Sequence, residues 1–153
     1  MLPTPVAITF VPAISADADS LVALRIEAMR ESLERIGRFD PARARERFMA
    51  TFAPSQTRHI VADGVRVGFL VVRPYQGELL LDHLYVHPQH QGRGIGSAVL
   101  QSVLAEAEAC KLAIRVGALR ESGSNRFYLR HGFTQVEQDE WDNYYVLPCP
   151  KVL

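Results

Sequence analysis

The sequence predicts an α+β protein, a three-layer α/β sandwich in which a mixed, mostly antiparallel sheet of about seven strands is flanked by about four helices. Stretches of alternating apolar residues, typical of strands, are interspersed with stretches in which apolar residues recur every three or four positions, typical of helices. The pair Asp63-Gly64 lies between two β-branched stretches, which indicates an antiparallel hairpin. A helix over 94–109 separates the fourth and fifth predicted strands, and such a crossover makes two strands parallel neighbours.

The first half of the chain is predicted as a strand, two helices and a hairpin. A strand over 6–11 precedes a helix that Ser15 can cap. The apolar residues of that helix share one face: Val22, Ile26, Met29, Leu33 and Ile36. Gly37 suits the position after its last turn, and Asp40 caps a second helix that runs through 42–52. The hairpin strands cover 57–62 and 65–73, with a turn at 74–77.

The second half alternates strands with helices. The expected elements are strands over 79–87, 112–119, 134–138 and 141–147, the helix over 94–109 and a short helix over 122–131. No repeat or linker interrupts the chain, so residues 1–153 are expected to form a single domain.

Composition excludes several classes of function. The 153 residues hold 17 Lys plus Arg and 17 Asp plus Glu, and this zero net charge argues against a nucleic-acid or anionic-membrane binder. No apolar segment approaches the ~18 residues of a membrane span. Cys110 and Cys149 are too few for a disulfide framework, and three prolines interrupt the start of the chain where a secretion signal would lie. We therefore expect a cytoplasmic protein.

A metal site is not expected. His83 and His87 lie on one predicted strand, about 13 Å apart at ~3.3 Å per residue, which is too far for two ligands of one ion.

A glycine-rich turn over 91–97 lies between a strand and a helix. Glycines permit unusual backbone angles and let N–H groups approach a ligand, and a helix N-terminus behind them attracts anions, so the turn fits a phosphate or pyrophosphate. The alternative is that the glycines only permit tight packing. The turn has no Lys, which argues against a Walker loop, and Ser97 occupies the third glycine position of the dinucleotide pattern.

Two segments carry a resemblance to a known family. The first is Leu84-Tyr85-Val86-His87-Pro88-Gln89-His90-Gln91-Gly92-Arg93-Gly94-Ile95-Gly96, and the second is Ser124-Asn125-Arg126-Phe127-Tyr128-Leu129-Arg130-His131-Gly132-Phe133. The first resembles the central motif of the GNAT superfamily of N-acetyltransferases, and the second resembles its later signature, a short helix that carries a tyrosine and ends in Gly-Phe. The order of elements also matches the GNAT (acyl-CoA N-acyltransferase) fold.

The resemblance implies that the protein binds acetyl-CoA and transfers its acetyl group to a primary amine. Backbone N–H groups of the turn would hold the pyrophosphate, the pantetheine arm would follow the strand that ends at Val86, and an N–H near Val86 would stabilise the thioester oxyanion. Many members also have an asparagine at the start of the short helix, and either Ser122 or Asn125 can take that place. The implied cofactor-binding residues are Leu84, Tyr85, Val86, Gln91, Gly92, Arg93, Gly94, Ile95, Gly96, Ser97, Ser122, Asn125 and Tyr128.

Two residues are candidates for proton transfer. Tyr128 matches the family's acid, which protonates the leaving thiolate, although its ring could instead only pack the short helix. Asp82 lies where some members carry the base; its alternative role is a salt-bridged or solvated strand residue. His83 competes for the same role with a pKa nearer neutrality, but alternation along a strand points it to the opposite face.

The resemblance implies that the loop between the first two helices and the last hairpin flank the acceptor. Arg30 or Arg38 could hold a substrate carboxylate, and the acids and aromatics of residues 137–145 could receive a cationic amine or form only an exposed turn. These features favour a small-molecule or amino-acid-like acceptor, with no nucleic-acid or membrane partner. The alternatives are a non-catalytic acyl-CoA sensor and a protein N-terminal or lysine acetyltransferase. The family also permits a homodimer.

Overall fold

The computed structural model describes residues 6–149, which form two compact units. Unit 1 comprises residues 6–71 and 83–101, and unit 2 comprises residues 72–82 and 102–149. Three elements contribute residues to both units: β3 (Val65–Tyr75), β4 (Glu78–Val86) and α3 (Ile95–Cys110).

The described strands form one seven-stranded sheet with the order β1-β2-β3-β4-β5-β7-β6, which confirms the predicted mixed sheet. The remaining strands are β1 (Ile8–Pro12), β2 (Thr57–Ala62), β5 (Ile114–Leu119), β6 (Thr134–Gln138) and β7 (Asp142–Leu147). β4 pairs with β5 in parallel, with Leu79 opposite Ile114, as the crossover helix predicts. β1 with β2, β2 with β3, β5 with β7 and β6 with β7 are antiparallel.

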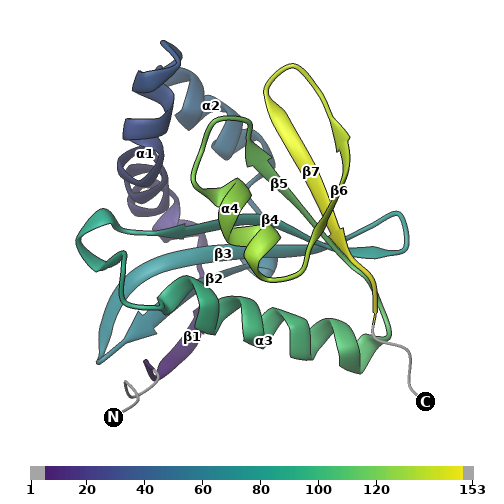
Figure 1. Ribbon diagram of the computed structural model, residues 1–153. Coiled ribbons are helices and arrows are strands. Elements are labelled where there is room, and N and C mark those ends of the chain that lie inside the picture. The colour runs from purple at the N-terminus through teal and green to yellow at the C-terminus, as the bar shows by residue number, and fades with distance from the viewer. Residues whose placement is uncertain (1–5, 150–153) are drawn as a thin grey trace. The chain divides into compact units, whose positions relative to one another are not determined.

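In unit 1, α1 (Ala18–Arg35) and α2 (Pro41–Thr51) run beside each other (Figure 1). Asp40 caps α2 as predicted, because its carboxylate accepts the N–H of Arg43 at 3.1 Å. Gly37, at φ +71°, ends α1, and the N–H of Arg38 reaches back to the carbonyl of Leu33 at 2.8 Å. The predicted cap at Ser15 is wrong, because residues 15–17 form a 3-10 turn and α1 begins after Asp17.

A hydrophobic cluster packs α1 and α2 against β3 and β4; we call it the α1–α2 cluster. Phe48 of α2 stacks on Phe52, with ring centroids 5.3 Å apart, and meets Phe69 of β3 edge-on at 5.8 Å. Its buried members are Ala13, Leu21, Val22, Phe48, Phe69 and Val71, and its partly buried members are Leu24, Ile26, Met49, Phe52 and Tyr85.

Two tight turns connect β3 to its neighbours β2 and β4. Asp63 and Gly64 both have positive φ, as the predicted hairpin requires. Gln76 and Gly77 do the same between β3 and β4, so β3 extends to Tyr75 and the predicted end at Arg73 is two residues short. Pro74, expected in the turn, lies within β3 although proline donates no backbone hydrogen bond.

In unit 2, β5 is followed by the short helix α4 (Ser124–Arg130) and the β6–β7 hairpin, drawn in yellow-green and yellow in Figure 1. β5 begins two residues later than predicted, because the chain turns at Lys111, whose φ is +59°, and Leu112 bonds back to Ala107 at 2.9 Å. A lysine in this left-handed position gives no sequence signal of the kind a glycine gives.

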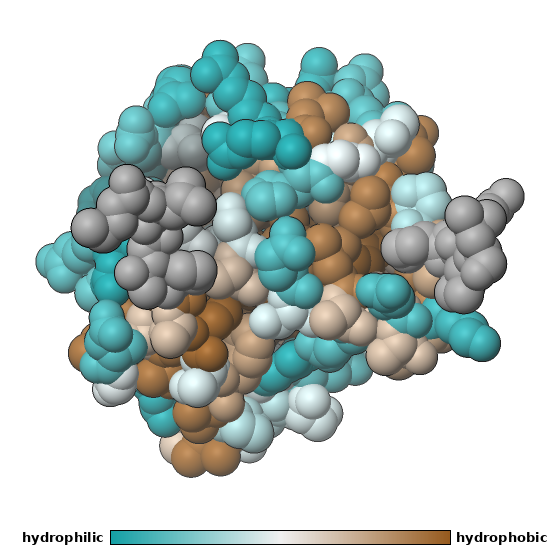
Figure 2. Space-filling view, turned by 60° about the horizontal axis from the view of Figure 1, so that its bottom comes forward, coloured by the Kyte–Doolittle hydropathy of each residue, from teal (hydrophilic) through white to brown (hydrophobic). Residues whose placement is uncertain are grey.

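Hydrophobic residues do reach the surface, but hydrophilic ones interrupt them on the face drawn in Figure 2. Within residues 6–149, no helix combines the length and apolar character that crossing a membrane requires.

Candidate functional site

The glycine-rich turn has open backbone at two of its glycines. Gly92 and Gly94 adopt φ of +80° and +78°, and a Cβ built on either would meet no other atom within 4 Å. The glycines are therefore required by backbone conformation and not by close packing of protein atoms. The carbonyl of Gly94 accepts the N–H of Ala98 at 3.1 Å, so the turn leads directly into α3 and the positive end of its dipole.

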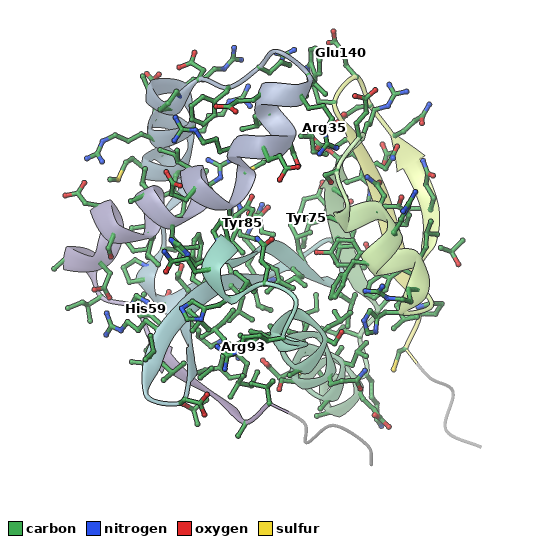
Figure 3. The ribbon with its side chains drawn as sticks, turned by 60° about the vertical axis from the view of Figure 1, so that its left-hand side comes forward. Arg35, His59, Tyr75, Tyr85, Arg93 and Glu140 are labelled. Atoms are coloured by element: carbon green, nitrogen blue, oxygen red, sulfur yellow. The ribbon has the colours of Figure 1, made fainter. Side chains whose placement is uncertain are left out.

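Two side chains of the turn, those of Gln91 and Arg93, anchor it to neighbouring elements. The amide of Gln91 donates to the carbonyl of Val86 at 2.9 Å, which ties the turn to the end of β4 across the short 3-10 segment Pro88–His90. Arg93, labelled in Figure 3, donates to Asp63 in the β2–β3 turn at 3.0 Å and lies 3.1 Å from the ring of His90. The side chains of Gln91 and Arg93 thus position the turn and leave its backbone open at Gly92 and Gly94.

The second half of β4 is unusually open for a strand in the middle of the sheet order. Residues 82–86 are all half-buried, whereas the five residues 67–71 of neighbouring β3 are buried. Gly68 of β3 allows β4 to come very close, because a Cβ built there would lie 2.2 Å from the carbonyl oxygen of Tyr85 and 3.1 Å from Cα of Val86. The backbones of β3 and β4 therefore lie unusually close together where the resemblance places the thioester.

His83 and Tyr85 project from β4 into the aromatic part of the α1–α2 cluster, and Figure 3 labels Tyr85 on its strand. Nδ1 of His83 lies 3.3 Å from the hydroxyl of Tyr85, and the two rings lie 6.1 Å from Phe48 and 5.5 Å from Phe69 respectively. The side of β4 that faces the first two helices therefore presents a titratable ring within an apolar wall.

Asp82 belongs to unit 2 and forms an ion pair. Its Oδ2 accepts from Nε of Arg73 at 3.1 Å, and its side chain remains 30% exposed. The salt-bridged alternative for Asp82 is thus observed, and its partial exposure leaves the carboxylate accessible to water.

Tyr128 is buried in unit 2, where its ring packs 5.4 Å from Phe133 and 6.2 Å from Tyr145. This packing holds the ring in place, which is required whether Tyr128 acts as the acid or only packs the short helix.

Asn125 is the centre of a hydrogen-bond network that the sequence did not reveal. Its amide N–H groups donate to the carbonyls of Leu119 at 2.8 Å and Ser122 at 2.9 Å. Its oxygen accepts from the hydroxyl of Tyr145 at 2.7 Å and the amide of Asn143 at 2.9 Å. The Asn125 side chain thus fastens the start of α4 to β5 and β7. The hydroxyl of Ser122 makes one described bond, donated to Leu119 at 2.8 Å.

The acids of the last hairpin bind neighbouring protein groups. Asp139 accepts the N–H groups of Asp142 and Trp141 and the hydroxyl of Tyr144, and these bonds hold the pKa of the Asp139 carboxyl below its usual range. The same contact raises the pKa of Tyr144 above its usual range. Glu137 pairs with Arg115 at 2.6 Å. This segment therefore has the character of the exposed acidic turn given as the alternative.

The arginines of α1 differ sharply in their surroundings. Arg30 is half-exposed, pairs with Glu34 at 3.0 Å and Glu27 at 3.5 Å, and lies over the ring of Phe39. Arg25 is half-buried; its Nη1 donates to the carbonyl of Ala44 in α2 at 2.9 Å, and its buried Nε has no hydrogen-bond partner. The sequence analysis did not single out Arg25, although its position between Val22 and Ile26 of the apolar stripe was a usable signal.

No group of three or more His, Cys, Asp or Glu side chains able to hold a metal ion occurs among residues 6–149. Neither Cys110 nor Cys149 forms a disulfide within the described residues.

Comparisons with known proteins bear on both the sequence and the fold. The family model described as Acetyltransferase (GNAT) domain matches residues 55–135, more than half of the chain. The L-methionine sulfoximine/L-methionine sulfone acetyltransferase of Salmonella typhimurium is 35% identical over 57 residues, which is 36% of this chain and only 33% of that protein.

Solved structures share the whole fold. The PaiA N-acetyltransferase of Thermoplasma acidophilum, solved with coenzyme A, has a TM-score of 0.74 at 15% identity, with 92% of this chain and 98% of that one covered. The ribosomal-protein-S18-alanine N-acetyltransferase of Escherichia coli has a TM-score of 0.66 at 16% identity, with 95% and 96% covered. The predicted fold is confirmed.

Proposed function

The chain belongs to the GNAT acetyltransferase family, and on that premise we propose that it transfers an acetyl group from acetyl-CoA to the primary amine of a small, amino-acid-like acceptor. The observation that carries this proposal is the turn over 91–97, with its left-handed Gly92 and Gly94, its open backbone and its place before α3.

The residues of unit 1 fit acetyl-CoA. The backbone of the turn offers N–H donors to the pyrophosphate, and the half-buried strand 83–86 offers main-chain groups to the pantetheine arm. When bound, acetyl-CoA supplies a thioester carbonyl that an amine can attack. No metal is needed for this chemistry, because the N–H near Val86 stabilises the developing oxyanion.

Two side chains complete the proposed reaction. As the amine nitrogen bonds to the acetyl carbon and the carbon–sulfur bond breaks, Asp82 takes the amine proton through water and Tyr128 donates a proton to the thiolate. The partial exposure of Asp82 supports its role, and the motif match supports that of Tyr128. His83 remains the alternative base, because its ring lies on the side of β4 that faces α1 and α2.

Among the cofactor-arm residues, we favour Ser122 over Asn125, because the Asn125 side chain already bonds to five protein groups. The amino-acid-like acceptor is supported by the similarity to a protein named for acetylating methionine analogues.

Calorimetric titration tests the proposal directly. Wild type should bind acetyl-CoA and CoA but neither NAD nor ATP, and Gly94→Val should lose this binding. Gly77→Val is a matched control, because Gly77 has φ +78° and equally open surroundings but lies in the β3–β4 turn. Failure of wild type to bind acetyl-CoA, or equal loss in both variants, would overturn the assignment. A release assay for free CoA thiol with a panel of amines then tests transfer.

A further inference from the structure

We propose that Arg25 is the residue that binds the acceptor's carboxylate, so that the protein selects amino acids over amines that lack a carboxylate. This inference rests on the proposed function and specifies the acceptor class of the same site.

Arg25 lies in an unusual place for a charged residue. It follows Leu21 by four positions and Val22 by three on α1, so it shares a helix face with two residues that are 2% and 3% exposed. Arginine is almost never fully buried unless it is paired, and the Nε of this half-buried Arg25 is itself buried. Within the part of the chain that the structure describes, no carboxylate pairs with it.

The hydrogen bonding of Arg25 leaves one edge of the guanidinium for a ligand. Nη1 is taken by the carbonyl of Ala44, while the buried Nε has no partner. A buried donor without a partner is costly, which favours a ligand that supplies the missing acceptor. A carboxylate matches the edge formed by Nε and Nη2, because two oxygens can accept from two parallel N–H groups.

The surroundings of Arg25 suit the rest of an amino acid. Its neighbours Leu24 and Ile26 pack in the α1–α2 cluster, which also contains Phe52 and Tyr85. His83 of β4 extends the same wall at 6.1 Å from Phe48. Arg25 thus lies beside an apolar wall that reaches β4, so an acceptor can combine a carboxylate at Arg25 with an apolar side chain on the cluster.

Arg30, one of the two arginines that the sequence suggested for this role, is a weaker candidate. Two glutamates already neutralise it, and its side chain is 51% exposed, so water competes with any carboxylate there.

The test compares pairs of acceptors that differ only in the carboxylate. Acetyl-CoA-dependent thiol release is measured with L-methionine, L-leucine and L-phenylalanine, and with 3-(methylthio)propylamine, isoamylamine and phenethylamine. Wild type should prefer each amino acid. Arg25→Met should lower kcat/KM for the amino acids about 10–100-fold, mainly through KM, because a charged hydrogen-bonded pair is lost, and should leave the amines unchanged. Arg25→Lys keeps the positive charge but loses the two parallel N–H donors of the guanidinium, so its kcat/KM for the amino acids should lie between those of wild type and Arg25→Met.

Arg45→Gln serves as the matched control. It breaks another link between α2 and α1, the pair with Asp19, but at an exposed position, so it should keep the wild-type preference. Circular dichroism establishes that each variant is folded. Because the readout is the ratio between two acceptors of the same enzyme, partial loss of active protein does not affect it. An unchanged ratio in Arg25→Met, or a wild type without preference for amino acids, would overturn the inference.

Failure of the proposed function has a different signature, namely no thiol release with any amine. Binding of the same six compounds is then measured by calorimetry. Preferential binding of amino acids that Arg25→Met abolishes supports the inference without catalysis, and equal binding of both classes refutes it.

Discussion

Gly68→Ala is expected to disturb the proposed reaction centre through the backbone of β4. The added methyl would lie 2.2 Å from the carbonyl oxygen of Tyr85, whereas an ordinary carbon–oxygen contact is about 3.3 Å. β4 must therefore move by roughly 1 Å near Val86, since the obstructing atoms are backbone and cannot rotate away.

Two magnitudes follow from that displacement. Forcing a methyl into packed strands costs about 1–3 kcal/mol of folding free energy. A 1 Å misplacement of a group that positions the reacting atoms costs on the order of 100-fold in rate. We therefore expect a protein that still folds, with kcat reduced about 100-fold because the N–H near Val86 no longer meets the developing oxyanion.

Urea unfolding and steady-state thiol release measure the two effects separately. Gly117→Ala is the control, because a Cβ at that strand glycine would meet only side-chain atoms of Tyr144, at 3.2 and 3.4 Å. That variant should keep kcat within a few-fold of wild type. If Gly68→Ala retains wild-type kcat and stability, β4 does not depend on this close approach and the reasoning fails.

Four further predictions concern the acid, pH dependence and cooperativity. Tyr128→Phe should lower kcat about 10²–10⁴-fold with little change in acetyl-CoA affinity by calorimetry, and an unchanged kcat would remove Tyr128 from the mechanism. The hydrogen bond from His59, at 2.9 Å, holds the pKa of the Asp17 carboxyl below its usual 3.8. The pair therefore stabilises the fold fully above pH 3.8, and this stabilisation is lost as pH falls toward the pKa of Asp17 in the folded state. In urea unfolding, Asp17→Asn should flatten the fall of stability at acid pH, and an unaltered fall counts against the pair. Burial lowers the pKa of His131 below 6.5, so stability should rise between the folded pKa and pH 6.5 in wild type but not in His131→Gln; an equal slope in both would contradict this assignment. Finally, because β3, β4 and α3 each belong to both units, thermal unfolding should show one transition by fluorescence and circular dichroism alike, and two separated transitions would indicate two domains.

Elements bounded by local signals could be predicted from sequence. Asp40 and Gly37 act on the backbone within three or four residues, and so does the Asp63-Gly64 turn, so their effect does not depend on the rest of the fold. The missed boundary at Lys111 has the opposite character. A non-glycine residue there adopts positive φ because the end of α3 closes over it, and nothing in the residue type indicates that.

In the candidate site, too, features set by the local backbone could be predicted, and features set by contacts distant in the chain could not. The conformation of the glycine turn was predictable because it depends on backbone angles that glycine alone permits easily. The network around Asn125 was not, because its partners Tyr145 and Asn143 are 20 and 18 residues away in the chain. Arg25 was missed because its partner, the carbonyl of Ala44, lies on another helix, and its place between Val22 and Ile26 of the apolar stripe was the only signal within α1.

The extent of the family match limits which parts of the function can be inferred from similarity. The family match covers residues 55–135, which includes β4, the glycine turn and α4 but neither α1 nor α2. Structures of 15–16% identity share the whole fold, so the fold itself permits wide variation in side chains. An acceptor is distinguished by side chains, and Arg25 with the cluster beside it lies mostly on elements outside the matched segment. The proposed choice of acceptor therefore rests on the chemistry of α1 and α2 in this chain, and the amino-acid preference proposed for Arg25 is the measurement that tests it.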